Sequence, residues 1–443
     1  MNDEDSLSVR LRRYGQVSTA VGGLAARLAS QKILKLKINQ SSHAQGLTNV
    51  LGGLKGPLMK VAQFLATVPG ALPPEYSDLF LSLQMNAPSM GWAFVRRRMT
   101  SELGPDWQNC FQEFSPEAAA AASLGQVHRA KHTDGQNLAC KLQYPDMASI
   151  IRADLSQLKL VLSLYETWSK ALDTAEVQEE IALRLEEELD YLHEAQNVAI
   201  YQRIFAVANS AYGVHIPEVF PNLTTKRLLT LSWMEGQSFL TKTEASLEDR
   251  NILARRLFMA WYYPFYHYGV IHGDPHPGNY TVRADGELNL LDFGCVRIFP
   301  PSFIHGVINL YRALQHDDLD LAVHAYEAWG FKNLNKEMID IITQWARLLY
   351  GPLLDDRIRP IQDLSDGSVG WDTATKVHQE LERLGGVRPP KEFVFMDRAA
   401  VGIGSVIMRL KAEQNWHQLF ESLIENFDVK SVEQRQTEIL KNS

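Results

Sequence analysis

The strongest constraint on this chain is the run HGDPHPGN at His272–Asn279. Asp274 precedes Asn279 by five positions, and Asp292 follows on an apolar run and is itself followed by Phe-Gly. Enzymes that transfer phosphoryl groups use such a set: one carboxylate orients or deprotonates the attacking hydroxyl, while an amide oxygen and a second carboxylate hold Mg²⁺ against the phosphates. We therefore expect Asp274 in the catalytic position, with Asn279 and Asp292 as metal ligands.

The segment between these motifs reads as a hairpin. Residues 280–283 and 287–291 have the composition of short strands, and residues 284–286 form a turn signal between them. A tight hairpin would bring Asn279 and Asp292 to one place, as a shared metal ion requires. The alternative takes the aspartates as turn or cap carboxylates. It would suit a lone Asp-Phe-Gly, whereas the complete set favours the metal site.

The totals of the chain exclude several classes of protein. With 443 residues, 45% of them hydrophobic and 22% charged, the chain is long enough for two or three domain-sized units with real cores. Its net charge of −8 argues against a general nucleic-acid binder. The three cysteines form no Cys-x-x-Cys, which fits a reducing compartment and suggests neither a disulfide framework nor a zinc site.

Neither a signal peptide nor a membrane span is predicted. The first residues, Met1–Asp5, are acidic and lack the apolar core of a signal peptide. The longest apolar runs, such as Ala399–Met408, are too short to cross a bilayer. We expect a soluble, cytoplasmic protein. A helix predicted around Tyr14–Lys37 has basic residues beside its apolar face. Such a face more often packs against its own domain, and peripheral membrane contact is the second expectation.

Residues 1–110 read as a helical N-terminal extension. Within it, Lys60 and Gln63 lie three positions apart on a segment with helical spacing, so they share one face of that helix. Residues 75–110 also read as helical. The expected core residues of this last stretch are Trp92, Phe94, Val95 and Met99.

Residues 111–235 read as a small lobe of strands, and residues 236–443 as a helical lobe. A run of alanines at 118–122 leads into a hairpin turn signal at 131–136, and the strand that follows at 137–143 carries Lys141. A strand, loop and lysine-bearing strand in this order is how a kinase small lobe covers ATP, with the lysine on the α- and β-phosphates. The residues expected to bind the nucleotide here, besides Lys141, are Ala120, Ala121, Ala122, Ser123 and Gly125.

The alanines stand where such a loop usually has glycines. Each Cβ restricts φ and occupies space near the phosphates, so we expect a stiffer loop and an altered nucleotide pose. The alternative is the start of a helix, because alanine is the best helix former. The strand with Lys141 follows at a suitable distance, which favours the loop.

A glutamate is needed to hold this lysine. Two long helices are predicted over 146–172 and 174–208, and the second is rich in acidic residues. Asp190 and Glu194 share one face at i and i+4, whereas Glu188 lies elsewhere on an ideal helix. We favour Glu194 as the partner of the lysine, with Glu188 as the second choice. A solvated acidic face is the alternative for the remaining acids.

Two strands are predicted at 215–219 and 227–234, and the second ends at Met234, which with Glu235 fits a hinge between the lobes. Backbone groups of such a hinge could bond the adenine edge. Later helices are predicted over 303–329, 335–351, 371–385 and 391–426. The polar tail after Phe427 is expected to fray.

Taken together, these motifs resemble those of the UbiB-like atypical kinases, the AarF and coenzyme-Q kinase group, over roughly residues 50–425. The resemblance implies an α+β fold: a bilobal protein-kinase-like fold with a small β-containing lobe, a helical lobe and a helical N-terminal extension. The matching positions are the alanine-rich run ending at His128, Lys141, Glu188–Asp190 with Glu194, His272–Asn279 and Asp292–Gly294.

The hallmark of this family is an N-terminal Lys-x-Gly-Gln motif that folds over the active site. Here it reads Lys60-Val61-Ala62-Gln63, with alanine in place of the glycine. In the family this helix faces a Glu-x-Asp segment across the place that a protein substrate would occupy. The resemblance thus implies a catalytic set of Asp274, Lys141, Glu194, Lys60, Gln63, Glu188 and Asp190.

The family is implicated in ubiquinone or other isoprenoid quinone biosynthesis and in lipid homeostasis. We expect binding of ATP or ADP with Mg²⁺, and ATP hydrolysis or phosphoryl transfer to a small or lipid-like molecule such as a quinone precursor. After Gly294 the chain passes directly into a predicted helix, without the long activation segment that supports a peptide substrate. The alternatives are a soluble small-molecule kinase of the choline or aminoglycoside type, and a nucleotide-gated lipid-binding protein with negligible turnover.

Overall fold

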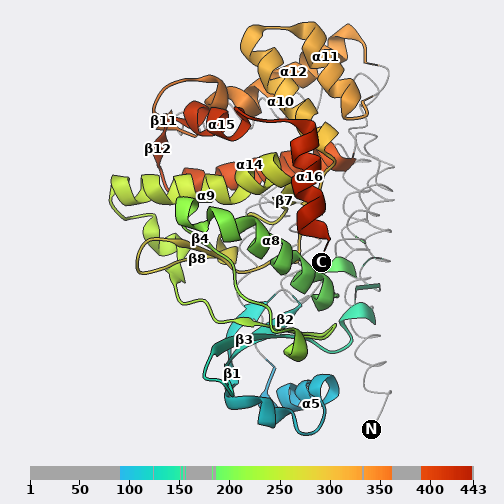
Figure 1. The fold of residues 1–443 in the computed structure, drawn as a ribbon, viewed down its shortest axis with the longest axis vertical. Helices are drawn as coiled ribbons and strands as arrows, with labels where there is room; N and C mark the ends of the chain where they lie inside the picture. Colours follow the sequence, from blue (N-terminus) through green and yellow to red (C-terminus); the bar gives the residue numbers. More distant parts are fainter. Residues whose placement is uncertain are drawn as a thin grey trace, which may run out of the picture. The chain divides into compact units, whose positions relative to one another are not determined.

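The computed structural model describes residues 90–122, 124–149, 186–331, 334–361 and 391–441, with positions 151, 152, 155 and 182. Two compact units divide the chain: Met1–Pro88 with Pro145–Leu185, and Ser89–Tyr144 with Glu186–Ser443. Every helix and strand named below belongs to the second unit (Figure 1). The predictions that lie wholly or largely outside the described residues are the helices at 14–37, 146–172 and 371–385 and the pair Lys60 and Gln63.

Four antiparallel strands form the first sheet, in the order β1-β2-β3-β5. They are β1 (Phe111–Ala122), β2 (Gly125–His132), β3 (Asn137–Gln143) and β5 (Leu228–Ser232). A turn containing Gly135, whose φ is +96°, joins β2 to β3 as predicted. The predicted alanine loop is wrong in part. Residues 118–122 continue strand β1 because their backbone pairs with β2, and this pairing overrides the weak strand propensity of alanine.

Helix α5 (Trp92–Leu103) packs against this sheet and is followed by the 3₁₀ turn η2 (Trp107–Cys110). The predicted core residues Val95 and Met99 are fully buried, whereas Trp92 and Phe94 are half-buried. Arg98 is also buried, and its guanidinium donates to the backbone oxygen of Gln143 at 3.1 Å. The helix is therefore attached to the end of β3 by a hydrogen bond as well as by apolar packing.

The helix predicted over 174–208 is interrupted within the described residues: positions 182, 186 and 187 are helical, and helix α8 (Tyr191–Tyr212) begins after a turn. Residues 188–190 form a turn, and Asp190 Oδ1 accepts from the backbone N–H groups of Leu192 at 3.0 Å and His193 at 3.4 Å. An aspartate that satisfies the unpaired N–H groups of a first turn is a preferred helix start. Glu188 and Asp190 therefore lie in the turn before α8, so Asp190 caps the helix that carries Glu194 and does not share a helix face with it.

A second sheet, in the order β4-β9-β8-β6, contains the predicted hairpin. Its strands are β4 (Val214–His215), β6 (Gln237–Ser238), β8 (Tyr280–Val282) and β9 (Leu288–Leu290). β8 pairs with β9 in antiparallel register, and the turn between them contains Gly286, with φ +79°. The hairpin prediction is confirmed. Two further strands, β7 (Val270–His272) and β10 (Val296–Ile298), pair with each other.

Helices build the rest of this unit: α9 (Leu247–Tyr268), α10 (Pro301–His316), α11 (Leu319–Ala328), α12 (Lys336–Leu354), α14 (Lys391–Arg409), α15 (Trp416–Ile424) and α16 (Val429–Leu440). Short 3₁₀ turns are η3 (Pro221–Leu223) and η4 (Phe239–Lys242). The helix predicted over 303–329 is two helices, because Asp317 adopts a left-handed φ of 54° and Asp318 caps α11. The helix predicted over 391–426 is interrupted by strand β12 (Glu413–Gln414), which pairs with β11 (Arg359–Pro360).

The tail after Phe427, which was expected to fray, forms helix α16 instead. Two of its apolar residues, Val432 and Ile439, are buried in the main core. The other side chains of α16 are mostly polar, and two of them, Arg435 and Gln436, bind the backbone of other elements. A reading based on hydrophobicity alone therefore underestimates how firmly α16 is attached.

Gln436 attaches α16 to the segments around the strand pair β7–β10. Its Nε2 donates to the backbone oxygens of Tyr268 and Phe299, at 2.9 Å in each case. Tyr268 ends α9 and Phe299 follows β10, so one side chain holds both segments. A Cβ on Gly269 would lie 2.4 Å from Gln436 Nε2, so the absence of a side chain at this left-handed position makes the contact feasible.

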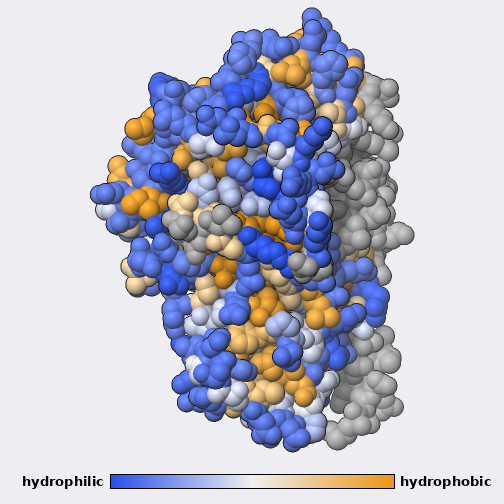
Figure 2. Space-filling model, in the orientation of Figure 1, coloured by the Kyte–Doolittle hydropathy of each residue, from blue (hydrophilic) through white to orange (hydrophobic). Residues whose placement is uncertain are grey.

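The face of the molecule in Figure 2 is mainly hydrophilic over the helices, and apolar residues gather over the sheet that contains β1, β2 and β3. Among the described helices, none combines the length and the hydropathy that crossing a bilayer would require.

Replacing the glutamine of this contact tests the role of α16. Gln436→Ala should lower the free energy of unfolding by about 1–2 kcal/mol, because two partly buried backbone oxygens lose their donor. Gln434→Ala is the matched control, since Gln434 is exposed on the same helix and bonds only locally to Glu438. Urea midpoints of the two variants would be compared with the wild type. Equal midpoints for both would contradict the attachment.

His267, in the last turn of α9, should make stability depend on pH. Burial and the nearby charge of Arg435 lower the pKa of His267 from 6.5 to about 4, and its ring packs on Tyr263 at 4.5 Å between centroids. Because folding favours the neutral imidazole, its contribution is complete above pH 6.5 and is lost as pH falls toward 4. His267→Asn should flatten the decline of the unfolding free energy over this range, whereas the exposed-site control His316→Asn should not.

Candidate active site

Lys141 is the residue at which separate elements meet. It lies on β3, which pairs with β2 on one side and β5 on the other, so two ladders fix its backbone. Its Nζ lies 2.8 Å and 2.9 Å from the two carboxylate oxygens of Glu194 on α8. Glu194 is only 3% exposed and the side chain of Lys141 is 18% exposed, so the ion pair is largely shielded from water. The glutamate that sequence reasoning placed first is the one that contacts the lysine.

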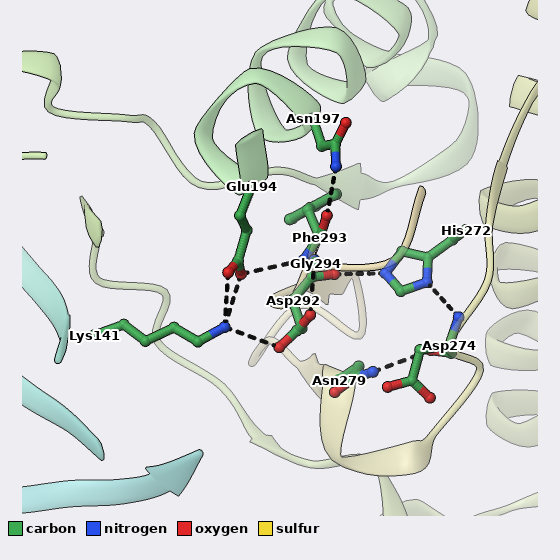
Figure 3. A network of polar contacts seen from close by, with 9 residues as sticks. All are labelled: Lys141, Glu194, Asn197, His272, Asp274, Asn279, Asp292, Phe293 and Gly294. Carbon is green, nitrogen blue, oxygen red and sulfur yellow. Dashed lines mark hydrogen bonds and ion pairs between the residues drawn. The ribbon is translucent and has the colours of Figure 1, made fainter. Parts of the chain in front are cut away.

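The same ammonium group reaches the Asp-Phe-Gly segment. Lys141 Nζ lies 3.2 Å from Asp292 Oδ2, and Figure 3 shows Glu194 and Asp292 converging on it from two sides. Burial alone would lower the pKa of Lys141, but Asp292 and Glu194 outweigh it and hold this pKa well above its ordinary value. The lysine is therefore a cation at neutral pH, and the strand lysine and the later aspartate share one site.

The backbone around Asp292 is held by side chains from neighbouring elements. Asn197 Nδ2 donates to the backbone oxygen of Phe293 at 2.9 Å, and Gly294 N donates to Asp292 Oδ1 at 3.0 Å. Phe293 itself is fully buried. Sequence reasoning did not single out Asn197. It lies three residues after Glu194 on the same helix face, and a buried amide on an otherwise apolar face would have been the signal.

His272 links the loop of Asp274 to the segment of Asp292 (Figure 3). The backbone N–H of Asp274 donates to His272 Nδ1 at 3.1 Å, so Nδ1 is the acceptor and carries no proton. The proton is then on Nε2, which donates to the backbone oxygen of Asp292. Trp261 Nε1 donates to the backbone oxygen of His272 at 3.0 Å and holds this residue against α9.

Asn279 ends the 3₁₀ turn η5 (Pro277–Asn279), and its side chain points back to Asp274. Its Nδ2 donates to the backbone oxygen of Asp274 at 3.0 Å, so its Oδ1 is turned away from that oxygen. The backbone oxygen of Asn279 accepts from Leu291 N at 3.0 Å, one residue before Asp292. The hairpin thus brings the two predicted metal ligands together, as the spacing indicates.

These oxygens suit Mg²⁺. The ion is usually bound by one or two carboxylates together with the phosphate oxygens of a substrate. Asp292 and Asn279 supply a carboxylate and an amide oxygen, and Asp274 lies beside them (Figure 3). In the described part of the chain, no group of three or more His, Cys, Asp or Glu residues is placed to hold a metal ion. The oxygens of Asp292 and Asn279 are of the kind that Mg²⁺ takes in proteins.

Met234 and Glu235 lie on the connection between β5 of the first sheet and β6 of the second, where a hinge was predicted. The fully buried Asn289 on β9 donates from Nδ2 to the backbone oxygen of Glu235 at 3.0 Å. Arg129 on β2 pairs with the Glu235 carboxylate, and its guanidinium lies 4.8 Å from the ring centroid of Trp233. Sequence reasoning missed Asn289 and Arg129, because both act on the hinge from distant strands.

The remaining predicted residues lie around this centre or outside the described chain. Ala120, Ala121 and Ala122 pair with Val127, Gln126 and Gly125 at the end of the β1–β2 hairpin, whereas Ser123 and the Lys60–Gln63 pair are outside the described residues. Glu188 lies near Gly294, since a Cβ on that glycine would be 3.8 Å from Glu188 Cγ. Asp190 lies just before α8 and caps its first turn.

Comparison with known proteins identifies relatives of this chain. The ABC1 atypical kinase-like domain family matches residues 82–325. Protein ACTIVITY OF BC1 COMPLEX KINASE 3, chloroplastic, of Arabidopsis thaliana is 29% identical over 75% of this chain and 47% of its own length. Atypical kinase COQ8, mitochondrial, of Saccharomyces cerevisiae is 28% identical over 67% of this chain and 60% of its own. An uncharacterized Synechocystis protein is 30% identical over 66% of this chain and 76% of its own.

A solved structure supports the fold. The complex structure of Rv3197 with erythromycin, from Mycobacterium tuberculosis, aligns with a TM-score of 0.60 and 25% identity, over 90% of this chain and 98% of that one. The chain spans about half the length of the first curated relatives that it matches. The family match covers more than half of the sequence and includes every motif of the site described above. The chain therefore belongs to the ABC1 atypical kinase-like family, the UbiB-like group, and has its α+β kinase-like fold.

Proposed function

We propose that this protein binds ATP or ADP with Mg²⁺ and catalyses ATP hydrolysis or phosphoryl transfer to a small or lipid-like molecule. The observation that supports this most strongly is the position of Lys141, within 3.2 Å of both Glu194 and Asp292. A strand lysine held by a helix glutamate next to the Asp-Phe-Gly aspartate is the arrangement that kinases use to position nucleotide phosphates. Membership of a kinase-like family supports the same activity.

Each residue of the centre receives a role in this proposal. Lys141, fixed by Glu194, contacts the α- and β-phosphates, and Asp274 orients the attacking water or hydroxyl group. Asn279 and Asp292 hold Mg²⁺ through their side-chain oxygens. When bound, the ion would supply positive charge to the phosphate oxygens. The hydrogen bond from Asn279 Nδ2 to the backbone oxygen of Asp274 would keep the metal ligand and the nucleophile-orienting residue in register.

The outer residues complete the proposed pocket. Ala120–Ala122 with Ser123 and Gly125 would cover the nucleotide, and the backbone of Met234 and Glu235 would bond the adenine edge. Lys60, Gln63, Glu188 and Asp190 would border the acceptor side, as the family resemblance implies. The proximity of Glu188 to Gly294 agrees with a place next to the metal ligands.

The acceptor is proposed to be small or lipid-like because little chain separates the metal-binding segment from the next helix. β10 follows Gly294 almost directly, and α10 begins at Pro301. This leaves no long segment at that position to support a peptide. Ubiquinone or isoprenoid lipid metabolism is the proposed setting, with peripheral membrane contact as part of it. Family membership favours this over a choline- or aminoglycoside-type kinase.

The metal assignment is tested by nucleotide-induced stabilisation. For the wild type, ATP should raise the melting temperature more with Mg²⁺ than without it, because a ligand at 100 times its Kd adds about 2.7 kcal/mol of stability. In Asp292→Asn the Mg²⁺-dependent part of the shift should largely disappear. Each variant is compared with its own nucleotide-free melting temperature, since Asp292 also pairs with Lys141.

Asp340→Asn serves as the control for this measurement. Asp340 is exposed on α12, so the same change of charge there should leave the nucleotide shift as large as in the wild type. Mg²⁺-dependent shifts of equal size in Asp292→Asn and the wild type would remove Asp292 from the metal site.

The role of Asp274 is tested by turnover. Phosphate release from ATP should require Mg²⁺ in the wild type and fall by about 100-fold or more in Asp274→Asn, because a positioned acid–base group contributes about 10²–10⁴-fold to the rate. The nucleotide thermal shift of this variant should persist, since Asp274 is not proposed to hold the metal.

The alternative of a nucleotide-gated lipid-binding protein predicts a different pattern. It would show a thermal shift with nucleotide but no phosphate release by the wild type, even when vesicles containing anionic lipid are added. That result would replace the enzymatic proposal by the binding one.

A further inference from the structure

Tyr191 lies among the charged residues of the site, although sequence reasoning gave it no role. It is the first residue of α8 and is only 1% exposed. The Nζ of Lys141 lies 5.2 Å from the centroid of its ring. Its backbone N–H donates to the backbone oxygen of Lys226 at 3.2 Å, which fixes the start of the helix. Tyr191 and Glu194 are at i and i+3, so both contact the lysine from one helix face.

The hydroxyl of Tyr191 is buried and lacks a hydrogen-bond partner within the described part of the chain. A buried tyrosine hydroxyl usually finds a partner, and one left unpaired has a cost in free energy. Burial raises the pKa of Tyr191 despite the opposing charge of Lys141, so the hydroxyl keeps its proton at neutral pH. Among the described residues, this neutral donor therefore has no acceptor, and it lies next to a largely buried cation.

Gly125 shows where this hydroxyl points. A Cβ on Gly125 would lie 3.0 Å from the hydroxyl oxygen of Tyr191 and 2.2 Å from the backbone oxygen of Leu142. In the strand register, Gly125 is two positions before Val127, and Val127 lies opposite Lys141, so position 125 faces the same side of the sheet as the lysine. The hydroxyl thus lies between the tip of the alanine-rich hairpin and the lysine.

We propose that the Tyr191 hydroxyl donates a hydrogen bond to the phosphate chain of the bound nucleotide. The inference rests on the proposed function, under which the hairpin tip and Lys141 contact the phosphates from two sides. An anionic phosphate oxygen is a strong acceptor and would satisfy the hydroxyl of Tyr191, which the described residues leave unpaired. Tyr191 would then favour nucleotides with a phosphate chain over adenosine.

The competing explanation is that Tyr191 is a core residue whose hydroxyl is a tolerated defect. In that case phenylalanine would serve equally well with or without a nucleotide. Both explanations predict that Tyr191→Phe folds, because the substitution keeps the ring and removes only an unpaired buried hydroxyl. They differ in the response to phosphate-bearing ligands.

Titration calorimetry of wild type and Tyr191→Phe with ADP and ATP, in the presence of Mg²⁺, provides the test. Adenosine is measured by displacement of a fluorescent nucleotide. The variant should bind ADP and ATP about tenfold more weakly, equivalent to about 1.4 kcal/mol, and bind adenosine within about twofold of the wild type. Without nucleotide, its melting temperature should be unchanged or higher.

Tyr144→Phe is the matched control, because the Tyr144 hydroxyl is also buried and unpaired but its ring packs on Phe94 of α5. It should leave the affinities for ADP and ATP unchanged. Wild-type affinity for ADP and ATP in Tyr191→Phe would overturn the inference alone, as would an equal loss for adenosine. A wild type that binds no adenine nucleotide would overturn the proposed function, and the inference with it.

Discussion

The ammonium group of Lys141 lies between the carboxylates of Glu194 and Asp292, and the rest of the site depends on this contact. The three residues come from a strand, a helix and the segment after a hairpin, and none of the three elements is close to another in sequence. Buried charges are tolerated when they are paired and costly when one partner is missing. The relative position of the three elements is therefore tied to charge pairing, and apolar packing on either side supports it.

Around this ion pair, the motifs are held together by side chains that bind the backbone of another motif. His272 faces the backbone oxygen of Asp292, Asn197 binds that of Phe293, and Asn279 binds that of Asp274. Such contacts fix the backbone that carries the neighbouring carboxylates. The carboxylate of Asp292 is in addition bound by Lys141 and by the backbone N–H of Gly294. These contacts are already present in the protein alone, so the proposed binding of a nucleotide would not have to order them.

The sequence predicted an element correctly where neighbouring residues determine its structure or where a motif is complete. The hairpin around Gly286, the lysine-bearing strand, the pairing of Lys141 with Glu194 and the kinase-like fold were all predicted correctly. The predictions are wrong where a single capping side chain, or a partner far along the chain, determines where an element begins or ends. Asp190 moves the start of α8 to Tyr191, pairing with β2 extends the alanine run as a strand, and polar contacts to distant backbone order α16. Asn289 and Asn197 escaped notice for the same reason, since the groups that they bind lie far along the chain. The roles assigned to the site residues stay predictions.

The contact made by Gln436 has a consequence for sequence variation among related chains. The glutamine binds main-chain oxygens of Tyr268 and Phe299, which any amino acid at those positions would also present. This contact therefore sets no requirement of its own on the side chains at positions 268 and 299. Gly269 is constrained twice, by its left-handed φ of +69° and by the nitrogen that would lie 2.4 Å from an added Cβ. Positions 269 and 436 should therefore covary in homologues, although Gly269 follows α9 and Gln436 lies on α16, far along the chain.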